Sequence, residues 1–326
     1  MRRISVVEAL RGLASISVAL FHFCGQLSSR EAQVFTNYGW LGVDVFFVIS
    51  GFVIPLSLYG KNYRIADFPS FMLRRMVRLE PPYLVSITLT LLLWHASTRI
   101  PGFAGQGPSY SFPQIAYHLF YLVPLTHYQW LSPVYWSLAY EFVFYITVGL
   151  VFSTLITRHV AVTFCFGFIV FGISFAVWDV PDVRIIEFVV GALLMRATVC
   201  ERRNVEITLW LVASVVLTFI VGDVATGLIV SFVAASIFFM RDVDFGRFAI
   251  FLGSISYSLY LIHVPIGGRI VNLLKRFGQG LPYEIFITAA ALLISAFAAV
   301  LFCRLVEGPS LAISRNIKIL EKTFDI

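Results

Sequence analysis

"RGLASISVALFH", residues 11–22, lies inside an apolar run that extends from about Val6 to Leu27. A run of this length is about what an α-helix needs to cross the hydrocarbon core of a bilayer. It nevertheless contains an arginine and a histidine, and a charge at the bilayer centre costs about 2.5–3.5 kcal/mol on insertion scales. In a helix, Arg11 and His22 share one face, about three turns or about 16 Å apart along the axis. The sequence therefore predicts that this face contacts protein or water rather than lipid.

The composition of the whole chain is that of a membrane protein. Of its 326 residues, 59% are hydrophobic and 13% are charged, whereas soluble domains average about 25% charged residues. We predict an all-α polytopic membrane protein with about ten transmembrane helices around a polar intramembrane cavity. An apolar but short stretch at 113–125 is expected to be interfacial or re-entrant. The ten expected spans are residues 5–27, 39–59, 79–98, 132–155, 160–178, 182–200, 206–222, 224–240, 248–270 and 282–306.

The placement of lysine and arginine predicts the orientation. With the N-terminus inside, seventeen of the 24 Lys and Arg residues fall in inner segments, six fall in outer segments, and Arg11 lies in the membrane. The positive-inside rule then places both termini in the cytoplasm. The net charge of +6 follows from this distribution, and no basic domain with interleaved aromatic residues is present to bind nucleic acid.

Neither a disulfide framework nor a metal site is expected. The four cysteines are scattered and form no Cys-x-x-Cys pair: Cys24, Cys165, Cys200 and Cys303. No His-x-x-x-His pair or Cys/His cluster has metal-ligand spacing. The first span is not expected to be a cleaved signal peptide, because Arg11 interrupts its apolar core and no small-x-small cleavage site follows. One membrane domain over residues 1–326 accounts for the whole chain.

The second expected span carries a carboxylate near its outer end, in "GWLGVDVFFVISGFVIP", residues 39–55. Asp44 and His22 each lie about five residues from the outer ends of spans that are antiparallel neighbours, so we expect them to meet at one depth. A carboxylate bound to one imidazole nitrogen fixes the tautomer and leaves the other nitrogen as a base. The alternative is that Asp44 is a polar cap at the helix end. Gly42, Ser50 and Gly51 are small positions that favour close helix packing.

A basic segment, "FPSFMLRRMVRLEPPYL", residues 68–84, precedes the third expected span. Arg75 and Arg78 share one side of an expected short interfacial helix, with Arg74 beside them. Many arginines at such positions serve only to orient the span, by the positive-inside rule, or to contact lipid headgroups. Since the arginine fork also binds phosphate with two hydrogen bonds, a phosphate-bearing cytosolic ligand is the functional alternative.

Two further spans carry polar residues at helical spacing. In "SPVYWSLAYEFVFY", residues 132–145, Ser137, Glu141 and Tyr145 share one face, with the carboxylate about ten residues into the bilayer. Such a residue is functional by default, and the alternative is a salt bridge or capped pair, for which Arg11 is one partner. In "GSISYSLYLIHVPIGG", residues 253–268, polar residues form a stripe on one helix face that ends near the level of His22. A hydrogen-bonded packing role is an equally good explanation for the histidine of this stripe. This stripe consists of Ser256, Tyr260 and His263.

Five motifs in series give the chain a family resemblance. They are "ALRGLASISVALFHF", "GWLGVDVFFVISGFVI", "FMLRRMVRLEPPYL", "WSLAYEFVFY" and "SISYSLYLIHVPI". Together they resemble the acyltransferase-three family of integral membrane acyltransferases, in the family's order and over nearly the whole chain. The resemblance implies an O-acyltransferase of the bacterial inner membrane. Such enzymes move an acyl group, often acetyl, from cytosolic acyl-CoA to a hydroxyl of an extracytoplasmic glycan or glycoside.

The resemblance also assigns residues. The family's Arg-x10-His pair maps to Arg11 and His22, and its Arg-x-x-Arg pair maps to Arg75 and Arg78. Its tryptophan-serine-leucine-glutamate element maps to Trp136, Ser137, Leu138 and Glu141. Some members carry a fused extracytoplasmic SGNH-type hydrolase domain. Because this chain ends about twenty residues after the last expected span, we expect a single acyltransferase domain over residues 1–326 without such a fusion.

The expected chemistry combines these assignments. Acyl-CoA, above all acetyl-CoA, would place its phosphates on Arg75 and Arg78 and pass its arm beyond Arg11. His22 would then act as general base on the acceptor hydroxyl or accept the acyl group itself, and the sequence leaves both routes open. Asp44 and Glu141 complete the expected catalytic set, and the residues expected to bind the saccharide or glycoside acceptor are Ser137, Tyr260 and His263. Membrane lipids are the remaining expected partners.

A proton-coupled transporter is the strongest alternative from another class, because intramembrane Arg, His, Asp and Glu suit that function too. Transporters of this kind are built from inverted repeats with interrupted helices in corresponding positions, and the sequence shows neither. A structural scaffold is the weaker alternative, since it needs no polar path through the membrane. The motifs favour the enzyme.

Overall fold

The computed structural model describes residues 4–27, 30–100, 108–157, 184–200 and 205–317, and within these ranges the regular structure is helical, with no strand. Six helical segments are long and apolar enough to cross a membrane, and two shorter apolar helices accompany them, α9 (Val205–Val221) and α10 (Val224–Met240). The prediction of an all-helical membrane protein is confirmed. The six segments are Ser5–Cys24, Gly39–Tyr59, Ile65–Thr98, Trp136–Ser153, Gly246–Leu274 and Leu281–Asn316.

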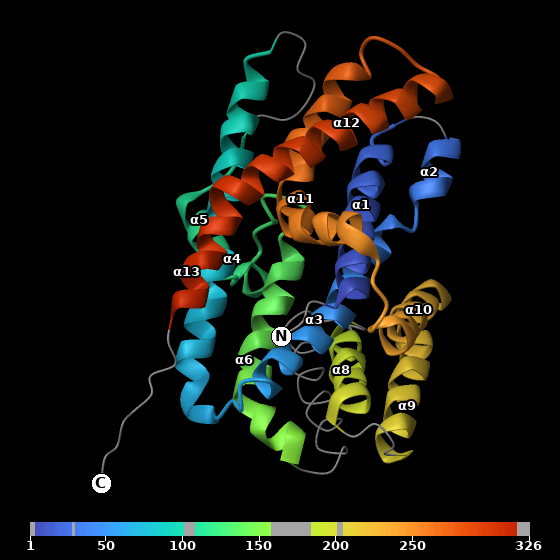
Figure 1. Cartoon of the computed structure of the whole chain (residues 1–326). Helices are drawn as coiled ribbons and strands as arrows, with labels where there is room; N and C mark the ends of the chain where they lie inside the picture. The colour runs from blue at the N-terminus through green and yellow to red at the C-terminus, as the bar shows by residue number, and fades with distance from the viewer. Residues whose placement is uncertain (1–3, 28–29, 101–107, 158–183, 201–204, 318–326) are drawn as a thin grey trace.

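Most expected spans coincide with a helix (Figure 1). The expected span 160–178 lies outside the described residues, and the span expected at 182–200 is a shorter helix, α8 (Arg184–Met195), followed by a π-helical turn (Arg196–Cys200). The stretch at 113–125 contains the short helix α5 (Phe112–Leu119) and a 3₁₀ turn (Val123–Leu125). The longer helices are α1 (Ser5–Cys24), α3 (Gly42–Tyr59), α4 (Phe68–Thr98), α6 (Trp136–Thr157), α11 (Gly246–Leu274) and α12 (Leu281–Phe302).

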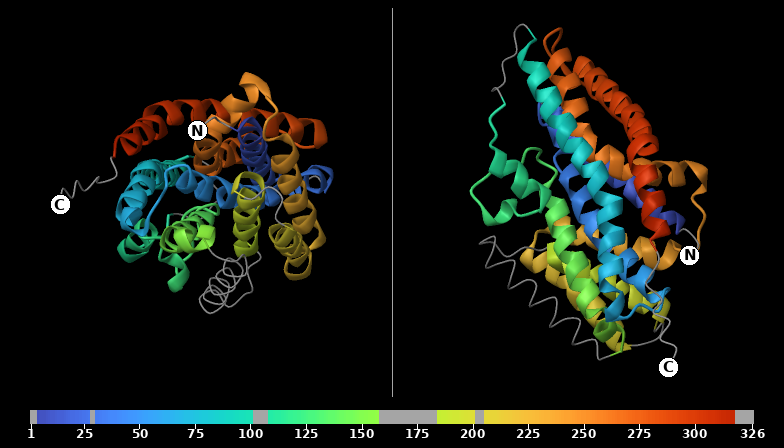
Figure 2. Two further views of the ribbon diagram at one scale, coloured as in Figure 1. Left: turned by 60° about the horizontal axis from the view of Figure 1, so that its bottom comes forward. Right: turned by 90° about the vertical axis from the view of Figure 1, so that its left-hand side faces the viewer.

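The basic segment is not a separate interfacial helix, contrary to the prediction. It forms the first turns of α4, which continues for 31 residues through Pro81 and Pro82. Membrane helices tolerate internal proline where neighbouring groups satisfy the freed backbone carbonyls. One continuous helix therefore holds the arginines in a fixed relation to the span that follows, and α4 runs beside α6 along the molecule (Figure 2).

The C-terminal helices also form one unit. After α12, a π-helical turn (Cys303–Glu307) leads directly into α13 (Gly308–Asn316), and α13 packs against α4. Figure 1 shows this arm, coloured red, crossing the molecule diagonally. The Arg74 Nε atom donates a hydrogen bond of 2.9 Å to the backbone oxygen of Ile317. The end of α13 is thereby attached to the basic end of α4.

Glycines set the closest helix contacts. Gly51 of α3 and Gly191 of α8 face each other, and a Cβ on Gly191 would meet backbone atoms of Val48, Gly51 and Phe52. On the other side of the core, a Cβ on Gly12 of α1 would lie 2.5 Å from the Cβ of Leu252 in α11. Small residues at such crossings let helix backbones approach within membrane proteins. These contacts fix α1, α3, α8 and α11 relative to one another.

The Gly191→Ala substitution is expected to destabilise the protein by about 1–3 kcal/mol or more, because the new methyl group meets backbone that cannot rotate away. The matched control is Gly268→Ala, whose Cβ would meet only the flexible side-chain amide of Gln26. Thermal unfolding of the two purified variants measures the difference. Equal melting temperatures would contradict the tight α3–α8 contact.

Candidate active site

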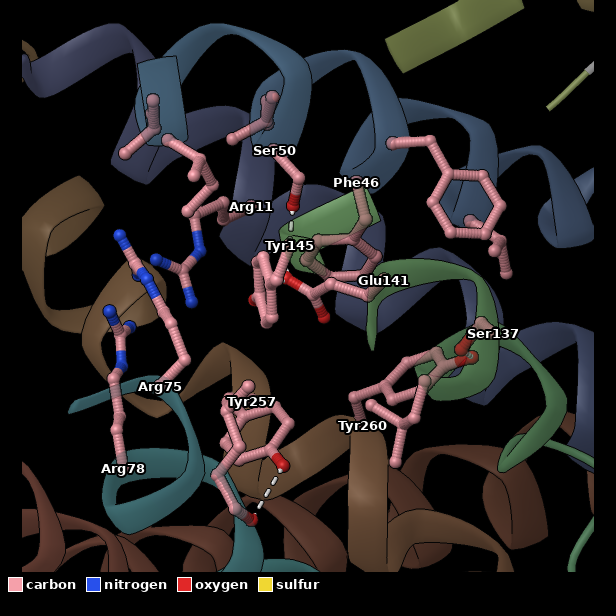
Figure 3. Close-up of a pocket in the computed structure, with 17 residues that line it drawn as sticks. Arg11, Phe46, Ser50, Arg75, Arg78, Ser137, Glu141, Tyr145, Tyr257 and Tyr260 are labelled. Carbon is pink, nitrogen blue, oxygen red and sulfur yellow. Dashed lines mark hydrogen bonds between the residues drawn. The ribbon is translucent and has the colours of Figure 1, made fainter. Parts of the chain in front are cut away.

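A cavity with about 800 Å³ of empty space, part of it open to solvent, lies among α1, α3, α4, α6 and α11. Apolar side chains of α3, including Phe46 and Phe47, form much of its wall. Figure 3 shows the arginine side chains towards one end, and Ser137 and Tyr260 towards the other. The polar residues that line it are Arg11, Ser50, Arg75, Arg78, Ser137, Glu141, Tyr145, Tyr257 and Tyr260.

Three guanidinium groups lie at one end of this cavity, those of Arg11, Arg75 and Arg78 (Figure 3). The guanidinium of Arg75 lies 5.4 Å from the ring centres of both Phe71 and Tyr145, within cation–π range. Its Nη2 atom also donates to the hydroxyl of Ser57 over 3.1 Å. Arg75 is therefore held in place by three contacts before any ligand binds.

Glu141 lies in the middle of the cavity. Its Oε1 atom accepts hydrogen bonds from the hydroxyl of Ser50, over 3.1 Å, and from the hydroxyl of Tyr145. Among the described residues no ion pair joins Glu141 to Arg11, so the partner considered from sequence is not the one used. Two hydroxyl groups therefore bind the Glu141 carboxylate, and Arg11 lines the same cavity.

Ser137 and Tyr260 meet at the other end of the cavity. Their hydroxyl oxygens are 2.6 Å apart, and both lie within 3.1 Å of the backbone oxygen of Val134. These contacts tie the start of α6 to α11. Their role in acceptor binding stays a prediction, whereas their proximity to each other is a property of the structure.

The two membrane histidines lie side by side beyond this end. The ring centres of His22 and His263 are 5.3 Å apart, and the ring of Tyr260 lies 6.1 Å from that of His263. His263 is fully buried, and its Nδ1 atom lies 3.0 Å from the carbonyl oxygen of Leu259, which requires a proton on Nδ1. Its Nε2 atom is buried with no hydrogen-bond partner in the part of the chain that is described. The pair thus places a buried acceptor nitrogen next to His22.

Asp44 does not lie at the level of His22, contrary to the prediction. A Cβ on Gly42 would contact Ala14, so α3 begins opposite the middle of α1 rather than opposite its end. Eight residues of α1 and two residues of α3 then separate His22 from Asp44, about 15 Å along the helix axes. Asp44 is buried within the helix packing. The register follows from close glycine contacts, which counting from span ends could not anticipate.

Among the polar residues of the cavity, Tyr257 was not singled out from sequence. Tyr257 lines its wall, and its hydroxyl donates to the backbone oxygen of Leu79 over 3.2 Å, which links α11 to α4. Ser256, which the helical stripe favoured, is buried and donates to Gly253 in its own helix. The spacing of Tyr257 and Tyr260 at i and i+3 was the available signal. Within the described residues, no group of three or more His, Cys, Asp or Glu side chains could hold a metal ion.

His118 anchors the segment that leads into α6. Its Nδ1 atom lies 2.8 Å from the backbone oxygen of Gln114, and its Nε2 atom accepts from the backbone nitrogen of Leu131 over 2.9 Å. Both contacts together require the neutral ring with its proton on Nδ1. Burial lowers the pKa of His118, against a smaller opposite effect of the Gln114 hydrogen bond.

A pH dependence of stability follows. Below about pH 6.5 the unfolded chain protonates this histidine, whereas the folded chain resists protonation, so stability is complete above that pH and falls as pH decreases. The apparent melting temperature between about pH 8 and pH 5 measures this loss. The loss is expected to be smaller in His118→Gln, with His127→Gln as the control. An identical pH dependence in His118→Gln and the unmodified protein would contradict it.

Comparison with known families places the chain in one of them. The model of the acyltransferase-three family, described as an acyltransferase domain, matches residues 4–304. The chain belongs to this family. The match includes all of the cavity residues and both histidines, and together with the apolar helices it indicates an integral membrane protein.

Among curated relatives, O-acetyltransferase OatA of Staphylococcus aureus (strain NCTC 8325 / PS 47) is 26% identical over 358 aligned positions, which cover 93% of this chain and 56% of OatA. The chain therefore spans about half the length of OatA. The SACOL0978 protein of Staphylococcus aureus (strain COL) is 33% identical over 189 positions, which cover 53% of this chain and 28% of that protein. No solved structure shows a significant match.

Proposed function

We propose that this chain is a membrane O-acetyltransferase that takes an acetyl group from cytosolic acetyl-CoA and transfers it to a hydroxyl of a saccharide or glycoside outside the cytoplasm. Family membership and the activity named for OatA support this proposal. The observation that carries it is a cavity with arginines at one end and the hydroxyls of Ser137 and Tyr260 at the other. A donor with an anionic head and a reactive end would lie along it.

The donor would bind by its phosphates. Arg75 and Arg78 project from the same side of α4 into the cavity, and arginine forks bind phosphate oxygens with two hydrogen bonds. Arg11 lines the space further along, where it would contact the arm or polarise its carbonyl groups. The positive-inside pattern supports a cytosolic position for this end, with ten spans and both termini in the cytoplasm of the bacterial inner membrane.

His22 is the proposed reacting base. The acceptor oxygen would attack the thioester carbon while His22 takes the hydroxyl proton; the carbon–oxygen bond forms, the carbon–sulfur bond breaks, and the proton passes to the leaving thiolate. In the alternative route a nitrogen of His22 attacks first and carries the acetyl group to the hydroxyl. The neighbouring ring of His263, 5.3 Å away, would orient His22, which is the role that the sequence predicted for Asp44.

Mass spectrometry of cell-surface glycans and small glycosides, with and without the gene, tests the proposed function. Deletion is expected to remove one acetyl group from a defined hydroxyl of one glycan class, and complementation by His22→Ala is expected not to restore it. Identical acetylation in both strains would contradict the proposal for surface acceptors.

A further inference from the structure

A second cavity adjoins the first at its basic end. It encloses about 930 Å³ of empty space, part of it open to solvent, between the end of α3, the start of α4 and α13. Arg75 and Arg78 line both cavities and form their common wall. The second cavity therefore lies on the other side of the two arginines that form the family's Arg-x-x-Arg pair.

Three further cations line the second cavity, and none belongs to the Arg-x-x-Arg pair. Lys61 follows α3, Arg74 lies on α4, and Arg315 lies on the last turn of α13. The hydrogen bond from Arg74 to the backbone of Ile317 holds α13 at this position. Residues about 240 positions apart in sequence thus converge on one basic pocket.

Basic side chains predominate over acidic ones in the lining of this pocket. Asp67 is the acidic residue that lines it, and its carboxylate already accepts a hydrogen bond of 2.9 Å from the backbone nitrogen of Arg64. Partial desolvation lowers the pKa of Lys61, and repulsion from Arg74 and Arg75 lowers it further. A bound anion would relieve this repulsion.

Resting on the proposed function, we infer that the second cavity binds the nucleoside end of acyl-CoA, with Lys61, Arg74 and Arg315 around its 3′-phosphate. The order of groups in the donor matches the order of the cavities. The acylated arm would lie in the first cavity, the diphosphate against Arg75 and Arg78 at the common wall, and the 3′-phosphorylated nucleoside in the second.

A lipid headgroup is the other source of a phosphate. The adjacency of the two cavities favours the nucleotide, because a headgroup would occupy the second cavity and account for nothing in the first. Binding of a lipid headgroup alone would also not explain why Arg75 and Arg78 line a cavity that ends at Ser137 and Tyr260.

Equilibrium binding to the purified full chain in detergent tests the inference without an acceptor. Acetyl-CoA is expected to bind at least about tenfold more tightly than 3′-dephospho-acetyl-CoA, because charge-assisted hydrogen bonds to the 3′-phosphate are lost in the latter. In the Lys61→Gln, Arg315→Gln double variant the ratio of the two dissociation constants is expected to fall towards one. The control is Arg304→Gln, an exposed arginine on the same helical arm that lines neither cavity.

Three outcomes would overturn the inference: no preference for the 3′-phosphate in the unmodified protein, the same preference in the double variant, or loss of the preference when phosphatidylglycerol is added, which would identify a lipid site. Transfer assays on the same samples keep the two proposals distinct. A 3′-phosphate preference without any acetyl transfer would contradict the proposed function and support the nucleotide site.

Discussion

His22→Ala is expected to lower the rate of acetyl transfer by about 10²–10⁴-fold, the range in which general base catalysis contributes. Without the imidazole nothing next to His263 can take the proton of the acceptor hydroxyl, and no nitrogen is available to carry the acetyl group. Donor affinity should hardly change, because His22 does not line the cavity that holds the arginines. The measurement is kcat with acetyl-CoA and the glycan acceptor, together with the donor dissociation constant.

The matched control for this variant is His127→Ala, a histidine outside the candidate spans whose ring contacts Tyr128. Full activity in a correctly inserted His22→Ala protein would contradict the proposed mechanism while leaving family membership intact. Incubation with labelled acetyl-CoA in the absence of acceptor separates the two routes. Label found on His22 would show that His22 carries the acetyl group. Absence of label from His22, together with normal turnover, would show that His22 acts as a general base.

Removing both motif arginines is expected to weaken donor binding by about a hundredfold or more, because each charge-assisted hydrogen bond contributes about 1.5–3 kcal/mol. The variant is Arg75→Gln, Arg78→Gln. Arg75→Lys should show a smaller loss, since it keeps the charge but loses the two-pronged geometry and part of its contact with the rings of Phe71 and Tyr145.

Binding of acetyl-CoA to the purified proteins measures this effect, with the exposed Arg247→Gln as the control. Because Arg75 also donates to Ser57, the melting temperature of each variant is measured to show that the helices remain packed. Unchanged affinity in the double variant would leave these arginines with only a topological role.

Much of the fold was predictable from the chain. Apolar length and helical spacing predicted the helices that contain Arg11, Glu141 and His263, because the bilayer admits few alternatives to a helix. The continuity of α4 was not predictable, since paired prolines at 81 and 82 normally mark a boundary. The meeting of Ser137 with Tyr260 likewise depends on tertiary packing between helices far apart in sequence.

The candidate site was predictable in its residues and less so in its pairings. Helical spacing correctly grouped Ser137, Glu141 and Tyr145 on one face of α6. The pairing of Asp44 with His22 was wrong because close contacts at Gly42 set the register of α1 against α3, and the length of the spans does not encode those contacts. His263 lies beside His22 for the same reason: close α1–α11 packing at Gly12 fixes their relative height.

The measurement that most directly tests transfer across the membrane uses sealed proteoliposomes with labelled acetyl-CoA outside and the glycan acceptor trapped inside. Labelled acceptor is expected in the lumen, and the Arg75→Gln, Arg78→Gln double variant and the His22→Ala variant are each expected to form it much more slowly. Label confined to acceptor supplied on the same side as the donor would contradict transfer across the membrane.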